Sequence, residues 1–359
     1  MNYNCMQQTE PRYPLFVPEA KSFAKTAQES VVQEPFSPQE IDMAYGISTS
    51  DSDGGGITIA LIEAFGADTL QEDFLSFGRY FSLPEKQLEV YYPYGKSVQT
   101  VPSWELEATT DTQWAYACAP GARIICVFAP DSQMQSLFSA VSYAISLGAD
   151  VISMSFGSSE FAGQQRYTLQ MKNSGKVFVA SAGDTGGSVV FPSSSDAVIS
   201  VGGTVFYRNA GGVFARTAWK DGGGGPSRFT PIPEWQRIFE GINEMSGGYR
   251  ATPDVALDAA VSPGYAVYYS NRGGIVGVGG TSVSAPVFAG LCARVLQKNT
   301  DAVTKAGGMA QYLYTLAGKT QYNEPQYNFF DITIGSNGRF NAMKGYDMCT
   351  GLGAPNNIG

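Results

Sequence analysis

The chain has 359 residues, a formal net charge of -9 at pH 7 and no histidine. The negative charge argues against nucleic acids and anionic membranes as partners, and no apolar run reaches the roughly 18 residues of a membrane-spanning helix. The lack of histidine excludes imidazole as a catalytic base. A nucleophilic serine in this chain therefore needs a carboxylate or a lysine as its base.

Residues 1–35 show mixed polarity and no clear hydrophobic period, so we expect an N-terminal arm or the remnant of a pro-segment. The first residues lack the basic and apolar regions of a secretory signal peptide. Residues 36–359 contain no convincing linker, and a single domain is predicted there. It begins with a short helix, in which Ser37 is the N-cap and Glu40 completes a capping box.

Apolar, strand-like runs alternate with helical patterns between residues 57 and 202. This alternation predicts an α/β fold with a mostly parallel central sheet, flanked by helices on both faces. In such sheets, sites form at the carboxyl ends of the strands. Loops and short strands are predicted for 205–275, and a short helix with a loop-rich ending for 300–359. The predicted strands are 57–63, 123–128, 150–157, 176–181 and 197–202, and the predicted helices are 69–81, 104–117, 133–147 and 164–174.

The segment from Gly279 to Pro286 joins an apolar, glycine-rich run to a helical pattern. Ser282 is therefore expected where a strand or loop meets the start of a buried helix, with backbone N–H groups that can face an oxyanion. Pro286 is expected in the first turn of that helix, where its missing N–H costs nothing. An ordinary helix N-cap also fits this pattern, because short serine motifs have many chance matches.

Carboxylates that could serve such a serine lie in two segments. Glu107 and Asp111 are four residues apart and share one face of a predicted helix. They are either two solvated acids or a pair held together out of water, which shares a proton and acts as a general base or acid. Asp184 follows the predicted strand 176–181. It either caps a turn or faces a cleft, where its protonated form donates to an oxyanion.

Taken together and in this order, the motifs of residues 36–359 resemble the sedolisin family, the serine-carboxyl peptidases with a subtilisin-like fold. Gly280-Thr281-Ser282 with Pro286 is similar to the family's nucleophile motif, and Glu107 and Asp111 match its Glu-x-x-x-Asp helix. The segment from Ser181 to Gly186 resembles the one that carries the family's oxyanion aspartate. Further similar segments are Val151–Gly157, Phe191–Ser195, Val201–Thr204 and Thr252–Val255.

The resemblance implies an acid-acting endopeptidase that hydrolyses peptide bonds in polypeptide substrates. Ser282 would attack the scissile carbonyl, Glu107 would take its proton, and Asp111 would hold and tune Glu107. Protonated Asp184 would stabilise the oxyanion. Glu63, at the end of a predicted strand, matches a carboxylate that extends this hydrogen-bonded chain in some members.

The resemblance also implies one structural calcium ion (Ca2+) in a loop near the end of the chain. Asp331 and Asp347 would supply carboxylates, and Ile332, Met343 and Gly345 would supply backbone carbonyls, with a water completing the six or more oxygens. Met343 stands where the family usually has glycine. The alternative is a polar turn that contains two unrelated acids.

Two further positions depart from the family pattern. Phe156 stands where many members carry tryptophan, and Val190 stands in a short loop that brings no acid before Phe191. The family implies an extracellular or acidic compartment, although no signal peptide is found. We expect a monomer.

Two other functions fit parts of the pattern. A catalytically inactive binding or assembly protein on the same fold would not need Ser282, Glu107, Asp111 and Asp184 together. A glycosidase that uses a carboxylate pair has no use for a serine in a Gly-Thr-Ser turn. The sequence therefore favours the peptidase.

Overall fold

The structure is a computed structural model, and it describes residues 19–21, 34–48, 52–208, 214–239, 241–318 and 328–358. Most of the segment 1–35 lies outside these ranges, so the expectation of an arm or pro-segment remnant concerns residues that are largely not described. Among the described residues, no helix combines the length and apolarity needed to cross a bilayer.

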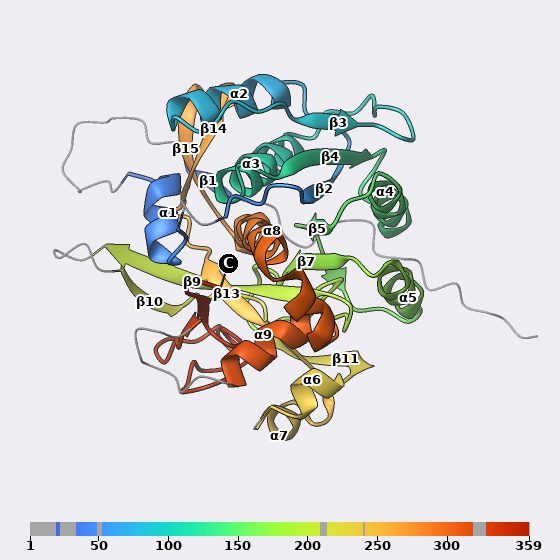
Figure 1. Cartoon of the computed structure of the whole chain (residues 1–359), viewed down its shortest axis with the longest axis vertical. Coiled ribbons are helices and arrows are strands. Elements are labelled where there is room, and N and C mark those ends of the chain that lie inside the picture. The colour runs from blue at the N-terminus through green and yellow to red at the C-terminus, as the bar shows by residue number, and fades with distance from the viewer. Residues whose placement is uncertain are drawn as a thin grey trace, which may run out of the picture.

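An eight-stranded sheet runs through the centre of the molecule (Figure 1). Its strand order is β10-β9-β7-β5-β2-β4-β3, and β13 pairs with β9. All pairs are parallel except β10 with β9, which confirms the predicted mostly parallel sheet. The strands are β2 (Thr58–Ala64), β3 (Glu89–Tyr91), β4 (Arg123–Ala129), β5 (Val151–Met154), β7 (Val177–Ser181), β9 (Ile199–Arg208), β10 (Phe214–Ala218) and β13 (Val255–Asp258).

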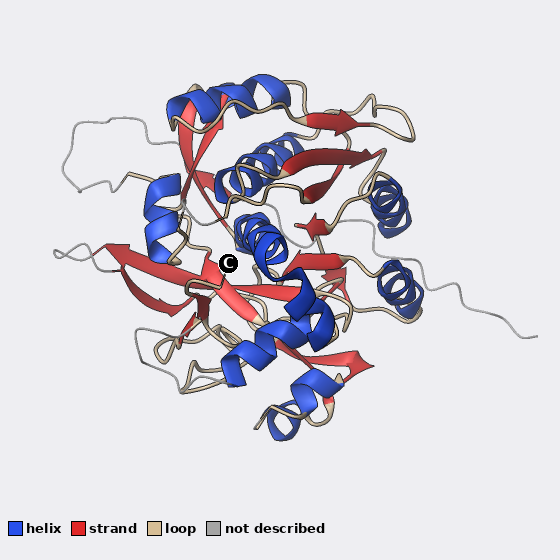
Figure 2. Cartoon of the chain, viewed as in Figure 1, coloured by secondary structure: helices blue, strands red, loops and turns tan. Residues whose placement is uncertain are grey.

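Helices cover both faces of this sheet, as predicted (Figure 2). One face packs against α3 (Pro102–Cys118) and α8 (Thr281–Ala306), and the other against α4 (Met134–Ser146) and α5 (Gln165–Ser174). Side chains alternate along a strand. Accordingly, Ile59 and Leu61 of β2 join the apolar cluster of α3 and α8, whereas Ala60 and Ile62 join that of α4. The same alternation directs Glu63 toward α3 and α8.

The remaining elements surround this core. A three-stranded sheet, ordered β1-β15-β14, leads into α8. The predicted capping box of Ser37 and Glu40 is confirmed at the start of α1. These elements are α1 (Pro38–Ala44), α2 (Leu70–Tyr80), α6 (Glu234–Arg237), α7 (Ile242–Ser246), α9 (Met309–Gly318), β1 (Glu19–Lys21), β6 (Ser158–Ser159), β8 (Val190–Phe191), β11 (Gly225–Pro231), β12 (Tyr249–Thr252), β14 (Tyr265–Tyr269), β15 (Gly274–Gly279), β16 (Phe329–Phe330) and β17 (Ala354–Pro355).

Helix α3 is buried on all sides from Trp104 to Cys118, although it carries several polar residues. Two of its side chains bind the neighbouring strand β14. Gln113 Nε2 donates to the carbonyl of Tyr268 at 2.8 Å, and the N–H of Tyr268 donates back to Gln113 Oε1 at 2.9 Å. Trp114 Nε1 donates to the carbonyl of Ala266 at 3.0 Å. These bonds compensate the burial of polar groups and fix the helix against the strand.

A buried ion pair joins the segment between β12 and β13 to the rest of the core. The side chains of Arg250 and Asp254 are 0% and 1% exposed. Asp254 also accepts a hydrogen bond from the N–H of Ser200 and one from the hydroxyl of Tyr314, both at 2.8 Å. The carboxylate therefore connects β9 and α9 through a single buried charge.

Replacing Arg250 by methionine should destabilise the protein strongly, because Asp254 would remain as an unpaired buried charge. We expect a loss of about 3–5 kcal/mol in the free energy of unfolding, measured by urea denaturation. The control is Arg237→Met, which breaks an ion pair with Glu234 whose side chains are 57% and 64% exposed. That change should cost less than about 1 kcal/mol. Equal losses in the two variants would contradict a structural role for the buried pair.

Candidate active site

Ser282 lies in the first turn of α8, directly after β15, as the sequence predicts. Gly280 joins the two elements with a φ of +113°, which favours glycine. A Cβ atom at this position would lie 2.6 Å from Asp184 Oδ2 and 3.3 Å from Ser282 Oγ. The glycine therefore allows the carboxyl of Asp184 to approach the backbone beside the Ser282 hydroxyl, where a side chain would clash.

Pro286 lies inside α8 beyond its first turn, so the expected position of this proline is wrong. In a regular helix the N–H of residue 286 would donate to the carbonyl of Ser282, and proline removes that donor. Ser155, which directly follows β5, provides a replacement, because its Oγ lies 2.9 Å from the Ser282 carbonyl oxygen. Ser155 thus connects the backbone of Ser282 to the carboxyl end of the sheet.

Three carboxyl groups lie buried beside Ser282. Glu107 and Asp111 come from α3 and Glu63 from the end of β2, and their exposed fractions are 3%, 0% and 0%. Burial raises the pKa of Asp111. Burial, together with the neighbouring charge of Asp111, raises the pKa values of Glu107 and Glu63 well above the usual range. The three groups therefore retain protons at pH values where exposed carboxyls have lost them.

A shared proton explains how Glu63 and Asp111 contact each other. Their direct interaction raises the pKa of Glu63 and lowers that of Asp111. Two carboxyl groups interact favourably only when one of them donates a proton. Neither oxygen of Glu63, nor Asp111 Oδ1, has another donor among the described residues. A proton between these two groups satisfies all of these observations.

The hydroxyl of Ser155 links the carboxyl of Asp111 to the backbone of Ser282. Ser155 Oγ lies 2.6 Å from Asp111 Oδ2 as well as 2.9 Å from the Ser282 carbonyl. A hydroxyl carries one proton. The hydroxyl therefore shares its hydrogen between Asp111 and the Ser282 carbonyl. Protonation of Asp111 would let Asp111 donate to Ser155 and free the hydroxyl hydrogen for the carbonyl. Sequence reasoning placed Ser155 in a family-like segment but assigned it no role.

Asp184 follows β7 and is held by the residue next to Ser282. Its Oδ1 accepts hydrogen bonds from the N–H of Thr281 at 2.8 Å and from Thr281 Oγ1 at 2.6 Å. Thr281 Oγ1 in turn accepts from the N–H of Gly183 at 3.0 Å. These bonds fix Oδ1, and Oδ2 lies close to the backbone of Gly280. Thr281 was not singled out in the sequence, although its place in the Gly-Thr-Ser run marks it.

The Ser282 hydroxyl lies between a carboxyl that can act as base and one that can donate to an oxyanion. Ser282 is fully buried, and its interaction with Glu107 partly lowers the raised pKa of that residue. The contact does not have the geometry of a standard hydrogen bond, and Ser282 Oγ has no such bond to any described residue. Catalytic hydrogen bonds are often loose before substrate binds. The arrangement is able to support nucleophilic attack on a carbonyl carbon.

The two acids of the predicted calcium loop converge on one short segment. Asp331 Oδ2 accepts from the N–H of Gly345 at 3.1 Å, and Asp347 Oδ2 accepts from the N–H of Met343 at 2.9 Å. The carbonyl oxygens of Ile332, Met343 and Gly345 accept no hydrogen bond from the described residues. Carboxylates and unpaired carbonyls are the ligands that calcium prefers. Since no group of three acidic or cysteine side chains in the described ranges is arranged to hold a metal ion, a cation here would depend on those carbonyls.

Comparison with known proteins agrees with this geometry. The Subtilase family model matches residues 106–330. Kumamolisin from a Bacillus species is 32% identical to this chain, over 91% of the chain and 63% of kumamolisin. Sedolisin from a Pseudomonas species is 28% identical, over 97% of the chain and 64% of sedolisin. The chain thus spans less than two thirds of the length of these relatives.

A solved structure is similar over nearly its whole length. It is described as Pseudomonas sedolisin, a serine-carboxyl proteinase, complexed with two molecules of pseudo-iodotyrostatin. Its TM-score is 0.77 at 27% identity, and the match covers 90% of this chain and 95% of the other. The subtilisin-like fold expected from the sequence is confirmed by this match. The chain belongs to the subtilase family and, within it, to the sedolisins.

Proposed function

We propose that the chain is an acid-acting serine-carboxyl endopeptidase, which hydrolyses peptide bonds in polypeptide substrates. The observation that carries this proposal is the close approach of the Asp184 carboxyl and the Ser282 hydroxyl to the same glycine, Gly280, at the start of α8. Glu107 is buried beside that hydroxyl. A catalytically inactive binding or assembly protein on the same fold is the alternative.

In the first step, Ser282 Oγ attacks the carbonyl carbon of the scissile bond and its proton passes to Glu107. The carbonyl oxygen becomes an oxyanion, which accepts a hydrogen bond from protonated Asp184. Glu107 then gives its proton to the leaving nitrogen, and the C–N bond breaks to leave an acyl-enzyme. Water attacks the ester with Glu107 again as base, which releases the product and restores the Ser282 hydroxyl.

The three buried carboxyls of Glu63, Glu107 and Asp111, called the buried row below, account for the proposed activity at acid pH. Glu107 must be ionised to accept the serine proton, and one negative charge among three buried carboxyls is less costly than two or three. The proton held between Glu63 and Asp111 keeps the second charge from forming, and a second proton, on Asp111 toward Ser155, would keep out the third. Asp111, anchored by Ser155, then holds Glu107 in place as the orienting acid does in a serine triad.

Removing the nucleophile or the base should abolish most of the activity. Ser282→Ala and Glu107→Gln should each lower kcat by about 10³-fold or more, and the double variant should be little worse than either, because residues of one catalytic unit are not additive. Activity is measured on an unfolded polypeptide at about pH 4, near the pKa of free carboxyls. Mass spectrometry of the fragments reports whether bonds are cut internally.

The matched control is Glu105→Gln, because Glu105 is a buried acid of the same helix that lies outside the buried row. This variant should retain near wild-type kcat. Near wild-type kcat in Glu107→Gln would show that Glu107 is not the base. Absence of cleavage by the wild-type chain, under conditions where it is folded, would favour the inactive binding protein.

Both activity and stability should fall as the pH rises from about 4 toward neutrality. Burial raises the pKa values of Glu63, Glu107 and Asp111, and it raises that of Asp258, at the end of β13, to about 7. The folded state then binds more protons than the unfolded chain, whose carboxyls titrate near about 4, so the free energy of unfolding falls with rising pH. Activity falls in the same direction because Asp184 donates only while protonated.

This pH dependence is checked by melting temperatures and by kcat/KM between pH 3 and pH 8. Glu63→Gln replaces one raised carboxyl by a neutral group of the same shape, so its melting temperature should depend less steeply on pH than that of the wild type. A kcat/KM profile that peaks at neutral pH or above would contradict the mechanism. A melting temperature that rises from pH 5 to pH 7 would contradict the protonation of the buried row.

We further propose that the segment containing Asp331 and Asp347 holds one structural calcium ion. The two carboxylates and the carbonyls of Ile332, Met343 and Gly345 would hold it. Its chemistry would be to neutralise two carboxylates and tie the 343–347 segment to the segment after β16. Support comes from the convergence of both acids on this segment and from its unpaired carbonyls.

Chelation should therefore lower the melting temperature near neutral pH by a few degrees, and added calcium should restore it, because a ligand of the native state stabilises by mass action. Asp347→Asn should melt lower than the wild type and lose its response to chelator. Asp301→Asn, in the exposed end of α8, is the control and should keep that response. A wild-type melting curve unmoved by chelator, with no metal found by elemental analysis, would refute the site.

A further inference from the structure

A pocket of about 730 Å³ opens beside the loop that carries Asp184. One wall is the segment Gly186–Val189, which begins two residues after Asp184 and continues into β8. The adjoining wall comes from Ser159 and Glu160, since β6 pairs with β8. A residue of extended chain spans at most about 3.6 Å, so the pocket begins within roughly two residues' reach of the proposed oxyanion site.

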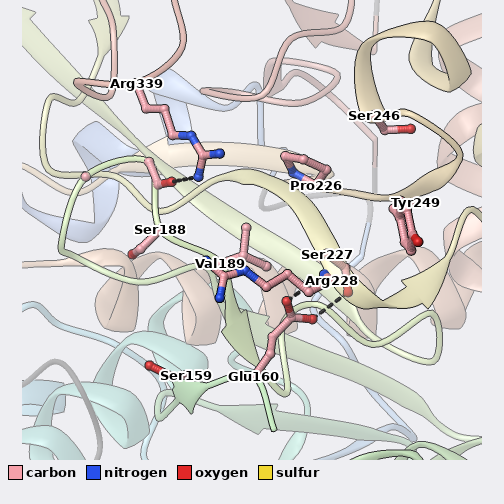
Figure 3. A pocket seen from close by; sticks show the side chains of 12 residues that line it. Ser159, Glu160, Ser188, Val189, Pro226, Ser227, Arg228, Ser246, Tyr249 and Arg339 are labelled. Atoms are coloured by element: carbon pink, nitrogen blue, oxygen red, sulfur yellow. Dashed lines mark hydrogen bonds between the residues drawn. The ribbon is translucent and has the colours of Figure 1, made fainter. Parts of the chain in front are cut away.

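The pocket is lined by two arginines and by one acid, Glu160, whose carboxylate accepts hydrogen bonds from neutral groups. Glu160 accepts a hydrogen bond from the hydroxyl of Ser227 and one from the N–H of Arg228 at 2.8 Å. Arg228 and Arg339 are exposed, and neither forms an ion pair with an acid of the described residues. Figure 3 shows the guanidinium of Arg228 beside Val189 and that of Arg339 near Ser188. With two arginines against one carboxylate, the pocket therefore carries a net positive charge.

A glycine at position 187 allows Arg339 to lie at the edge of the pocket. Arg339 lies on the loop before the proposed calcium segment, and its Nη1 donates weakly to the carbonyl of Gly187 at 3.5 Å. Gly187 has a φ of +52°, and a Cβ there would come within 2.4 Å of Arg339 Cβ. Any side chain at position 187 would displace the arginine. The glycine thus allows a residue from the far end of the sequence to border the pocket.

We infer that this pocket is a substrate subsite that selects a side chain with an ionised carboxylate, an aspartate or a glutamate of the substrate peptide within about four residues of the scissile bond. The inference rests on the proposed function, because it concerns the substrate of that same site. Arg339 and Arg228 would bind the carboxylate. Arginine forms two parallel hydrogen bonds to a carboxylate, which gives such a contact direction as well as charge.

The test uses pairs of fluorogenic peptides that differ only by glutamate or glutamine at one position, with that position moved through four residues on each side of the cleaved bond. Assays at pH 5 keep the free glutamate, with a pKa of about 4.3, mostly ionised. At one position we expect kcat/KM to be about fivefold higher for glutamate, which is the scale of a partly exposed ion pair. Added salt should reduce this ratio.

Variants assign the preference to the pocket. In Arg339→Gln the glutamate-to-glutamine ratio should fall toward one, and Arg339→Glu should favour a lysine peptide over the glutamine peptide. Arg79→Gln is the matched control, since Arg79 is an exposed arginine on α2 that does not line the pocket. It should keep the wild-type ratio. A ratio of one at every position in the wild type, or equal ratios in Arg339→Gln and Arg79→Gln, would overturn the inference.

A measurement of peptide binding without cleavage tests this inference separately from the proposed function. Fluorescence anisotropy gives the Kd of the same labelled peptides for Ser282→Ala and for Ser282→Ala combined with Arg339→Gln. Cleavage of the glutamine peptides without any preference for glutamate refutes the subsite and leaves the peptidase standing. Tighter binding of glutamate peptides that depends on Arg339, without cleavage by the wild type, refutes the peptidase and supports the subsite. No binding and no cleavage of any peptide refutes both.

Discussion

The structure depends on burying the carboxyls of Glu63, Glu107 and Asp111 together without a cation. None of the three forms an ion pair with a described lysine or arginine, and all lie against apolar parts of α3, α8 and the sheet. Ionising all three in such surroundings would cost several kcal/mol for each uncompensated charge. The fold therefore tolerates these residues only while they share protons. In a chain without histidine, the same sharing would set the pKa of Glu107, the base in the proposed function.

Pro286 and Ser155 connect the protonation of these carboxyls to the backbone of Ser282. The proline removes a helical hydrogen bond to the Ser282 carbonyl, and Ser155 supplies the missing proton while also contacting Asp111. Loss of the Asp111 proton would leave one hydroxyl hydrogen for two acceptors. The position of Ser282 is therefore coupled to the protonation of a residue on another helix, through a single hydroxyl.

Much of the fold and of the candidate site could be predicted because it depends on local pattern. The apolar runs predicted the strands that carry Glu63 and Asp184, and the four-residue spacing placed Glu107 and Asp111 on one face of α3. The position of Pro286 was predicted wrongly because the turn at Gly280, shaped by Asp184, sets the start of α8 before the proline. The contact of Arg339 with Gly187 was not predictable either, since no periodic pattern relates residues so far apart in the chain.

The buried row needs protonated carboxyls, whereas the arginine pocket needs an ionised carboxylate on the substrate. Both needs would be met only within a limited pH range. Burial holds protons on the row above the pKa of free carboxyls, whereas an exposed substrate glutamate loses its proton at about pH 4.3. Between these limits a substrate carboxylate is already charged for Arg339 while the row still holds its protons. Below this range the pocket loses its ligand charge, and above it the row loses the protons that its burial requires. Asp184 connects the two features, because its charge raises the pKa of Glu107 and the pocket begins two residues after it in the chain.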